Sequence, residues 1–301
     1  MKHVRLPAFA KINLCLHVLG RRADGYHELR TIFQTIGLHD TLEMSLLPRG
    51  SRAGILFECD DPALPTGREN LVWRAVAAAR RALRLSAGVR VRLEKCIPVG
   101  RGLGGGSSDA AMALAGVELL AGRHLPPEER FRIAAELGSD VPFFLLGGRA
   151  LGVGRGEEIY PLPEAPKRSV VVVSPAGIAV STREAYGWLR APALTTKASA
   201  RKLRSFCALS WSGQGSHLEN DFEAAVFRHH PRLARIKRAF LRHGAAGVAL
   251  AGSGSAVFGV FQTPAQARRA AMQFPDDQVF ITETVSSVEY RRAVSGRYPK
   301  D

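Results

Sequence analysis

Five glycines fall within seven residues between positions 100 and 106, and this segment limits the possible folds of the chain more than any other. Glycine adopts backbone angles that other residues avoid, so the segment can turn tightly and expose its N–H groups. Before it, alternating apolar and polar residues at 89–95 predict a half-buried strand. After it, Ser107, Ser108 and Asp109 are typical of a helix N-terminus, and an Ala- and Leu-rich helix follows to about residue 121. This order predicts a cradle for a diphosphate or triphosphate group.

Two known phosphate-binding motifs match this loop only in part. Residues 100–105 fit the pattern GxGxxG, but Pro98 interrupts the approach from the strand, and the acidic residue nearest the expected spacing, Glu118, falls inside the helix. A P-loop needs a lysine before its Ser or Thr, and Gly106-Ser107-Ser108 has none. The alternative is a glycine loop without a ligand. Because clustered glycines cost backbone entropy, we favour a phosphate loop of another type.

The first half of the chain is predicted to alternate between strands and helices. Residues 10–18 alternate between apolar and polar side chains, which predicts a half-buried strand with Lys11 and Asn13 on one face. Residues 21–27 contain Asp24-Gly25 and predict a turn. The other expected elements are strands at 29–36, 41–47 and 54–59, helices at 70–85 and 126–137, a short apolar element at 139–146 and a hairpin at 147–156.

Prolines at 161, 163 and 166 predict a linker, and we place a domain boundary there, which gives domains 1–160 and 161–301. In the second domain we expect strands at 169–174, 248–250, 256–261 and 278–282, and helices at 182–189, 218–230, 231–243 and after Pro264. Strands mixed with helices in short alternation predict an α+β fold.

Composition excludes several classes of protein. Hydrophobic residues make up 46% and charged residues 23%, and these globular values exclude bulk disorder. No apolar run approaches the roughly 18 residues of a membrane-spanning helix, and the N-terminus has no apolar signal core, so we expect neither a membrane partner nor secretion. The four cysteines, Cys15, Cys59, Cys96 and Cys207, are far apart. This spacing argues against a zinc site or a disulfide framework and predicts reduced, buried thiols in the cytoplasm.

The net charge is +15, and arginine supplies most of the basic residues. A basic surface attracts nucleic acid, membranes or phosphorylated metabolites. The arginines are scattered, however, and form no run of the kind that marks a nucleic-acid tail. We therefore interpret most of them as solvated surface residues.

Five blocks of the sequence together resemble the GHMP family of small-molecule kinases. They are residues 7–14 (PAFAKINL), 22–27 (RADGYH), 97–111 (IPVGRGLGGGSSDAA), 138–144 (GSDVPFF) and 251–255 (AGSGS). They span nearly the whole chain, and the glycine loop alone is typical of the whole superfamily. The resemblance implies a two-domain fold, in which the N-terminal domain is like domain 2 of ribosomal protein S5 and the C-terminal domain is ferredoxin-like. ATP and substrate would then meet in the cleft between the domains.

The blocks at 10–14 and 22–27 narrow the resemblance to one branch of the family. The acceptor in that branch is a cytidine diphosphate sugar-alcohol of the non-mevalonate route to isoprenoid precursors. The reaction that the resemblance implies is transfer of the γ-phosphoryl group of ATP to the 2-hydroxyl of this alcohol.

Lys11 and Asp140 are the catalytic residues that the resemblance implies. Asp140 would accept or orient the proton of the acceptor hydroxyl. Lys11 would keep that carboxylate ionised and offset the charge on the transferred phosphoryl group. From the sequence alone, a helix cap before Val141-Pro142 is the better interpretation of Asp140, and a solvated strand-face lysine is the better interpretation of Lys11.

Seven residues lie at the substrate in the family pattern: Asn13, Tyr26, His27, Thr182, Tyr186, Gly252 and Ser253. Tyr26 would stack on the cytosine and His27 would hydrogen-bond its edge. Thr182 and Tyr186 are four residues apart on an expected helix, hence on one side. Tyr186, where the family usually has Phe, would stack on the other face of the base. The alternatives are ordinary packing for these side chains and a tight turn at 252–255.

Thirteen residues form the nucleotide site in the family pattern: Asn70, Lys95, Pro98, Val99, Gly100, Arg101, Gly102, Leu103, Gly104, Gly105, Gly106, Ser107 and Ser108. Asn70 and Lys95 would lie near adenine, although a solvated lysine at a strand end is an equal interpretation of Lys95. The implied cofactors are ATP and Mg²⁺, and the hydroxyl of Ser107 or Ser108 could contact the metal. The histidines show no metal-binding spacing, so we assign no metal ligand.

Two alternatives stay open. The first is another kinase of the same family that acts on mevalonate, homoserine or a sugar. The second is a non-catalytic, basic protein that binds nucleic acid and keeps the S5-like domain. Against the second, the sequence has no aromatic RNA-binding motif and no basic tail. We therefore expect a small-molecule partner and no nucleic acid. The oligomeric state is not predicted.

Overall fold

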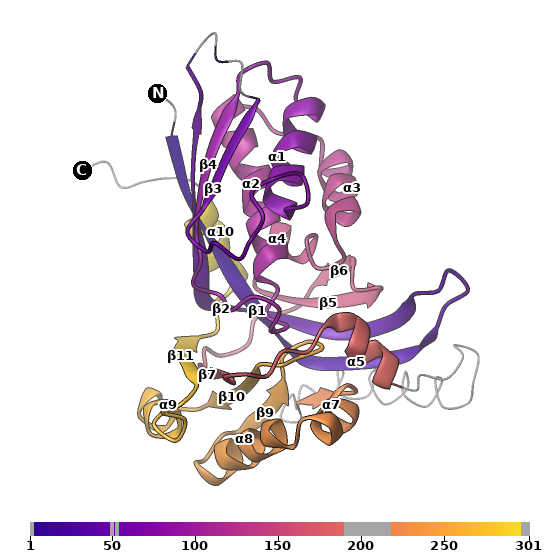
Figure 1. Cartoon of the computed structure of the whole chain (residues 1–301), viewed down its shortest axis with the longest axis vertical. Coiled ribbons are helices and arrows are strands. Elements are labelled where there is room, and N and C mark those ends of the chain that lie inside the picture. Colours follow the sequence, from indigo (N-terminus) through magenta and orange to yellow (C-terminus); the bar gives the residue numbers. More distant parts are fainter. Residues whose placement is uncertain (1–2, 49–50, 52–53, 190–217, 296–301) are drawn as a thin grey trace.

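The computed structural model describes residues 3–48, 51, 54–189 and 218–295. Within them the chain forms two sheets with helices packed against each (Figure 1). The larger sheet has the strand order β3-β4-β2-β1-β8, and β5 and β6 extend it from β2. Its strands are β1 (His3–Arg21), β2 (His27–Leu46), β3 (Ile55–Cys59), β4 (Val89–Glu94), β5 (Arg149–Gly154), β6 (Glu158–Pro161) and β8 (Glu219–Asn220).

Helices cover one side of the larger sheet (Figure 1). They are α1 (Leu71–Ala82), α2 (Gly105–Ala121), α3 (Pro127–Leu137) and α4 (Phe143–Leu146). Strand β4 has one apolar and one polar face, because Val89, Val91 and Leu93 are buried whereas Arg90 and Arg92 are exposed. The apolar face packs against these helices. Helix α2 is buried on nearly all sides because almost all of its residues are small or apolar.

The smaller sheet has the strand order β11-β7-β10-β9 and is antiparallel throughout. Its strands are β7 (Ser169–Ser174), β9 (Gly247–Leu250), β10 (Val257–Phe261) and β11 (Gln278–Glu283). The helices of this half are α5 (Thr182–Trp188), α7 (Glu223–His229), α8 (Pro231–Arg242), α9 (Pro264–Ala271) and α10 (Ser287–Val294). The predicted α+β class is confirmed, and this strand order with its crossing helices is the expected ferredoxin-like arrangement.

The two faces of β7 belong to different cores. Val171 and Val173 pack with residues of α8 and α9. Val170 and Val172 pack with Ile12 of β1 and with Leu103 of the glycine loop. Strand β7 is therefore fully buried, and its second face holds the smaller sheet against the glycine loop.

Two elements of the second half also join the first. The short strand β8 pairs in parallel with β1. From α10, the fully buried ring of Tyr290 enters the core of the larger sheet, and its hydroxyl donates to the carbonyl of Phe144. The boundary between domains 1–160 and 161–301 stays a prediction.

Three predictions about elements are wrong. The strands expected at 29–36 and 41–47 are one long strand, β2, which ends at Leu46, because pairing with β1 resumes at His39 after a bulge at residues 37–38. The helix expected at 218–230 begins only at Glu223, because Asn220 pairs with Leu16 in the sheet. Helix α2 begins at Gly105 with Gly104 as its N-cap, so Ser107, Ser108 and Asp109 lie inside its first turns.

The cysteine prediction is confirmed only in part. Cys15 is buried, and burial together with Glu219 and Asp221 raises the pKa of its thiol to about 12. Cys59 is half-buried, but Cys96, two residues after the end of β4, is exposed. Cys207 lies outside the described residues. None of the described helices is both long and apolar enough to span a bilayer.

Candidate functional site

A cleft of about 980 Å³ brings together segments from both halves of the chain. Its walls come from β1, the turn after it, the glycine loop, the start of α2, the residues before α4, helix α5 and the loop between β9 and β10. Twenty-one of the twenty-two predicted site residues line it, and Ser108 is the exception.

The glycine loop forms one wall and is held from both sides. The backbone N–H of Lys11 donates to the carbonyl of Leu103 over 2.9 Å. On the other side, Arg101 donates through its guanidinium to the hydroxyl of Ser255 over 2.7 Å. Gly102 has a φ of +80°, and a Cβ there would lie 1.9 Å from the carbonyl oxygen of Ala251. Only glycine allows this close approach of two backbones, so the loop is fixed before any ligand arrives.

Lys11 and Asp140 come from distant parts of the sequence and meet in the cleft. Lys11 Nζ lies 3.4 Å from Asp140 Oδ2, and the exposed fraction of the side chain is 5% for Lys11 and 34% for Asp140. The lysine is therefore buried rather than solvated. Asp140 does not cap α4, because that helix begins at Phe143 and its N-cap position is Pro142. The cap interpretation of Asp140 is wrong.

Asn13 connects Lys11 to the loop between β9 and β10. Its buried side-chain oxygen accepts from Lys11 Nζ over 2.9 Å and from the backbone N–H of Gly252 over 3.1 Å. Its amide group donates to the hydroxyl of Thr31 over 2.7 Å, and Thr31 was not among the predicted site residues. Both the oxygen and the nitrogen of the Asn13 side chain thus have hydrogen-bond partners. The bond from Lys11 Nζ to Asn13 orients the lysine toward Asp140.

Aromatic side chains surround the other end of the cleft. Tyr26 is 55% exposed, with the Arg155 guanidinium 4.8 Å from its ring centroid. His27 stacks directly on Tyr186, with ring centroids 4.6 Å apart and an angle of 25° between the rings. Tyr186 also meets the edge of Phe222 at 4.9 Å. A base therefore has no room between His27 and Tyr186 in this arrangement, whereas the ring of Tyr26 is open to the cleft.

Burial sets the ionisation of this aromatic group. It lowers the pKa of His27, and the nearby charge of Arg21 lowers it further, so the imidazole is neutral near pH 7. Burial also raises the pKa of Tyr186, and the carboxylate of Asp140 adds to that shift. A neutral imidazole can both donate and accept a hydrogen bond at a base edge.

Thr182 and Ser253 meet across the cleft, with their hydroxyl oxygens 3.2 Å apart. Thr182 is the first residue of α5, whose N-cap Ser181 forms a capping box with Glu184. Because Ser253 belongs to the loop between β9 and β10, this contact joins the predicted substrate residues of α5 to those of the loop.

Among the residues predicted to bind the nucleotide, Asn70 is the N-cap of α1 and accepts from the backbone N–H of Val72 over 2.8 Å. Lys95 is buried between two carboxylates, Asp40 and Asp109, with its Nζ 2.9 Å from Asp109 Oδ2. Burial alone would lower the pKa of Lys95, but Asp109 and Asp40 outweigh it and raise that pKa. The interpretation of Lys95 as a solvated lysine is therefore wrong.

Ser107 is the better of the two predicted candidates for contact with a metal. It lines the cleft, and its Oγ lies 4.0 Å from the position of a Cβ at Gly138, close to the segment that carries Asp140. Ser108 is fully buried beneath the loop. Among the described residues, no group of three or more His, Cys, Asp or Glu side chains could hold a metal ion. The Ser107 hydroxyl is an oxygen donor of the kind that Mg²⁺ binds together with phosphate oxygens and water.

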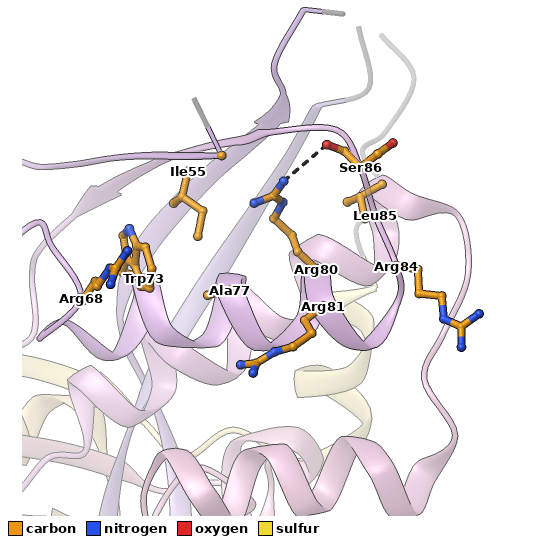
Figure 2. A pocket seen from close by; sticks show the side chains of 10 residues that line it. Ile55, Arg68, Trp73, Ala77, Arg80, Arg81, Arg84, Leu85 and Ser86 are labelled. Atoms are coloured by element: carbon orange, nitrogen blue, oxygen red, sulfur yellow. Dashed lines mark hydrogen bonds between the residues drawn. The ribbon is translucent and has the colours of Figure 1, made fainter. Parts of the chain in front are cut away.

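A second hollow of about 640 Å³ lies beside α1 and is lined in part by Arg68, Arg80, Arg81 and Arg84. Figure 2 shows that these arginines do not converge, because Arg84 points away from the others and Arg81 lies across the helix from Arg80. Arg80 is instead used by the fold, since its Nε donates to the carbonyl of Ala87 over 3.0 Å. We therefore place the candidate site in the cleft.

Known proteins match the chain over both halves. The GHMP kinases N terminal domain matches residues 70–148, and the GHMP kinases C terminal domain matches residues 199–277. The chain belongs to the GHMP kinase family. This kinase is 47% identical to a 4-diphosphocytidyl-2-C-methyl-D-erythritol kinase of Solibacter usitatus, over 96% of this chain and 91% of the relative. It is 43% identical to an enzyme of the same name from Moorella thermoacetica, over 95% of this chain and 100% of the relative.

Solved structures agree with this membership. The crystal structure of a 4-(cytidine 5'-diphospho)-2C-methyl-D-erythritol kinase matches with a TM-score of 0.76 and 36% identity, over 93% of this chain and 98% of that chain. A homoserine kinase from Cytophaga hutchinsonii matches with a TM-score of 0.74 and 18% identity, over 95% and 96%, and shows the common fold. The GHMP kinase is thus an ATP-dependent small-molecule kinase. This finding excludes the alternative of a non-catalytic protein that binds nucleic acid.

Proposed function

We propose that this kinase transfers the γ-phosphoryl group of ATP to the 2-hydroxyl of 4-diphosphocytidyl-2-C-methyl-D-erythritol, on the non-mevalonate route to isoprenoid precursors. Relatives that are 47% and 43% identical over almost the whole chain carry the name of that substrate. The observation that carries the proposal is the Lys11–Asp140 pair, which lies 3.4 Å apart in the cleft that the glycine loop also lines. A cytoplasmic location stays a prediction.

Asp140 is our candidate for the group that receives or orients the proton of the acceptor hydroxyl. The partial exposure of its carboxylate leaves one side open to the cleft. The ammonium of Lys11 beside this carboxylate offsets the negative charge that develops as the phosphoryl group moves. Because phosphoryl transfer depends mainly on positioning and electrostatics, one carboxylate and one fixed ammonium are sufficient protein groups at the reacting atoms.

The glycine loop and the start of α2 would hold the phosphates of ATP. The helix contributes its unpaired N–H groups and the positive end of its dipole. Mg²⁺, when bound, neutralises phosphate charge, and Ser107 is the residue that would hold it together with phosphate oxygens and water. Asn70 and Lys95 line the same end of the cleft and are our candidates for the adenine side.

The aromatic end of the cleft would hold the cytidine. We assign base stacking to the open ring of Tyr26, and hydrogen bonding to the base edge to His27. Since His27 and Tyr186 touch each other, Tyr186 supports the imidazole, and a place on the second face of the base requires the two rings to separate. Thr182, Gly252 and Ser253 line the same cleft and are our candidates for contact with the remainder of the substrate.

The test is an assay of ATP consumption against a panel of acceptor alcohols. We expect turnover with 4-diphosphocytidyl-2-C-methyl-D-erythritol and none with mevalonate, homoserine or a sugar. The Asp140→Asn variant should lose about 10²- to 10⁴-fold in kcat while its affinity for ATP is retained. The matched control is Asp276→Asn, which changes an exposed aspartate between α9 and β11 and should leave kcat unchanged.

Two results would contradict the proposal. Turnover with acceptors that lack the cytidine diphosphate group, at a similar kcat/KM, would assign the kinase to another branch of its family. Near-normal turnover by the Asp140→Asn variant would remove Asp140 from the reaction.

A further inference from the structure

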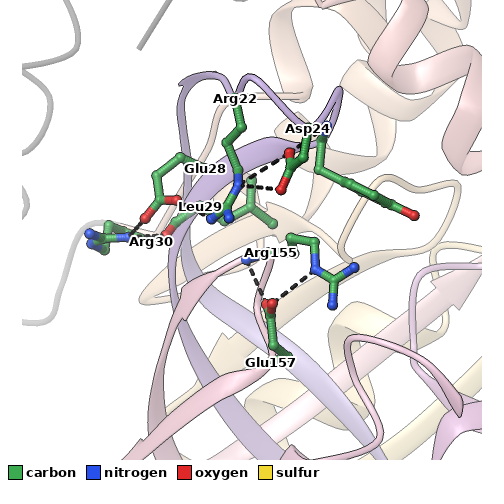
Figure 3. A network of polar contacts seen from close by, with 8 residues as sticks. Arg22, Asp24, Glu28, Leu29, Arg30, Arg155 and Glu157 are labelled. Carbon is green, nitrogen blue, oxygen red and sulfur yellow. Dashed lines mark hydrogen bonds and ion pairs between the residues drawn. The ribbon is translucent and has the colours of Figure 1, made fainter. Parts of the chain in front are cut away.

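Arg155 reaches the predicted base-binding ring from a different part of the chain. It lies in the turn between β5 and β6, and β5 pairs with β2 so that Gly154 is opposite Leu29. This pairing brings the turn that carries Arg155 beneath the turn after β1, as Figure 3 shows for Arg22 and Asp24. The Arg155 guanidinium lies 4.8 Å from the ring centroid of Tyr26, which is a cation–π distance.

Glu157 fixes the position of that guanidinium. Its Oε1 accepts from Arg155 Nε over 2.8 Å, and its Oε2 accepts from the backbone N–H of the same arginine over 2.6 Å. Both carboxylate oxygens of Glu157 thus accept hydrogen bonds from Arg155. The side chain of Arg155 is held against its own turn, as Figure 3 shows, and its guanidinium lies over the Tyr26 ring.

The backbone that carries Tyr26 is fixed by a separate set of contacts. Asp24 Oδ1 accepts from the backbone N–H of Tyr26 over 3.1 Å, and Arg22 binds both Asp24 and Glu28. These contacts set the backbone of the turn, but none of them involves the ring of Tyr26. Arg155 therefore supplies the contact that limits the rotation of this half-exposed ring.

We propose that Arg155 is a positioning residue for the cytidine. Its guanidinium lies over one face of the Tyr26 ring and leaves the other face for the base, so that the ring is ordered before the base arrives. A side chain that is ordered beforehand loses less entropy on binding, which tightens binding without a new contact to the substrate. This inference rests on the proposed function of Tyr26 as the base-stacking residue.

The experiment measures KM for 4-diphosphocytidyl-2-C-methyl-D-erythritol, KM for ATP and kcat in a double-mutant cycle. Arg155→Met keeps the length of the side chain and removes its charge. We expect it to raise KM for the cytidine substrate about three- to tenfold with kcat and KM for ATP within about twofold. Arg155→Lys keeps a cation over the ring and should restore most of the loss. In the background of Tyr26→Leu, adding Arg155→Met should change nothing further.

The matched control is Arg132→Met on α3, which removes an exposed arginine that also binds carboxylates, those of Glu129 and Glu136. It should leave all three kinetic parameters unchanged, and urea unfolding checks that every variant folds. If Arg155→Met raises KM equally with and without the Tyr26 ring, Arg155 contacts the substrate directly and the positioning role is overturned. An unchanged KM in Arg155→Met with a raised KM in Tyr26→Leu also overturns it. If Tyr26→Leu itself leaves KM unchanged, the proposed function of Tyr26 is the one that fails.

Discussion

At the scale of single residues, the cleft contains a cation between two buried carboxylates that are not equivalent. Asp40 receives backbone N–H groups from Cys96 and Ile97 in addition to Lys95. Asp109 accepts a hydrogen bond only from Lys95, at its Oδ2, and its Oδ1 has no hydrogen-bond partner in the described part of the chain. One ammonium cannot neutralise two buried carboxylates. Asp109 is the carboxylate with fewer hydrogen-bond donors, and burial raises its pKa to about 8.

This difference predicts how stability changes with pH in an Asp109→Asn variant. Because the pKa of Asp109 is raised in the folded state, the folded protein keeps a proton that the unfolded chain releases above about pH 4. The contribution of Asp109 to stability is complete below that pH and is lost as pH rises toward 8. Asparagine keeps the shape and does not titrate. We expect the stability of the variant relative to the wild type to increase by more than about 1 kcal/mol between pH 5 and pH 8.

Urea unfolding of both proteins at the two pH values measures this change, because groups common to both proteins cancel in the difference. A difference that stays constant, or that moves in favour of the wild type as pH rises, would show that Asp109 is ionised in the folded protein.

Residues such as Asp109 and Arg155 also show what the sequence could not predict. Lys11, Asp140 and the glycine loop belong to short motifs, so a resemblance was enough to propose them. Arg155 contacts the ring of Tyr26, which is more than a hundred positions away in the sequence. A contact between such distant residues produces no local pattern in the sequence. The same holds for Phe222, which packs edge-on against Tyr186.

At the scale of elements, the glycine loop is a docked segment rather than a flexible one. Gly100 and Gly102 have similar positive φ angles of 69° and 80°. They differ in surroundings, because nothing lies within 4 Å of a Cβ at Gly100, whereas a Cβ at Gly102 would overlap the carbonyl of Ala251. Alanine substitutions at the two glycines therefore separate two effects on stability. One is the strain of the backbone, and the other is the loss of contact between the loop and the smaller sheet.

Gly102→Ala should lower the free energy of unfolding by more than about 2 kcal/mol, since it adds overpacking to the strain of a left-handed alanine. Gly100→Ala, the matched control, should cost only the strain of about 1 kcal/mol. Chemical denaturation measures both values. Equal losses in the two variants would mean that contact between the loop and the smaller sheet adds no stability.

Element prediction succeeded where a local pattern decides the structure. The strand at β4 and the helices α1, α3 and α8 follow apolar periodicity or end signals that lie within the element. It failed where a distant partner decides. Asn220 lies in a strand because β1 is beside it, and α2 begins at Gly105 because the loop before it is docked on both sides.

At the scale of the whole molecule, a chain of hydrogen bonds joins the two sheets behind the Lys11–Asp140 pair. Asn220, which pairs with β1, donates to the carbonyls of Leu250 and Gly252 over 2.8 and 2.7 Å. The N–H of Gly252 donates to Asn13, which in turn accepts from Lys11. The position of Lys11 in the cleft thus depends on how the smaller sheet is held against the larger one.

Asn220→Ala should therefore reduce both stability and turnover. It leaves two buried carbonyls and the N–H of Phe222 without their partner, which should lower the free energy of unfolding by about 2–4 kcal/mol. Asn220→Asp should be worse, because a carboxylate oxygen then faces the two carbonyls. We expect kcat to fall with KM for ATP nearly unchanged, since the glycine loop is held by its own contacts.

A control variant must lose stability without loosening this chain of hydrogen bonds. Ser286→Ala removes the N-cap of α10 and should cost about 1 kcal/mol with kcat unchanged. Urea unfolding and steady-state kinetics on the same preparations separate the two effects. If Asn220→Ala loses stability but keeps the wild-type kcat, Lys11 is positioned by Asp140 and the larger sheet alone, and the smaller sheet serves the substrate rather than the reacting pair.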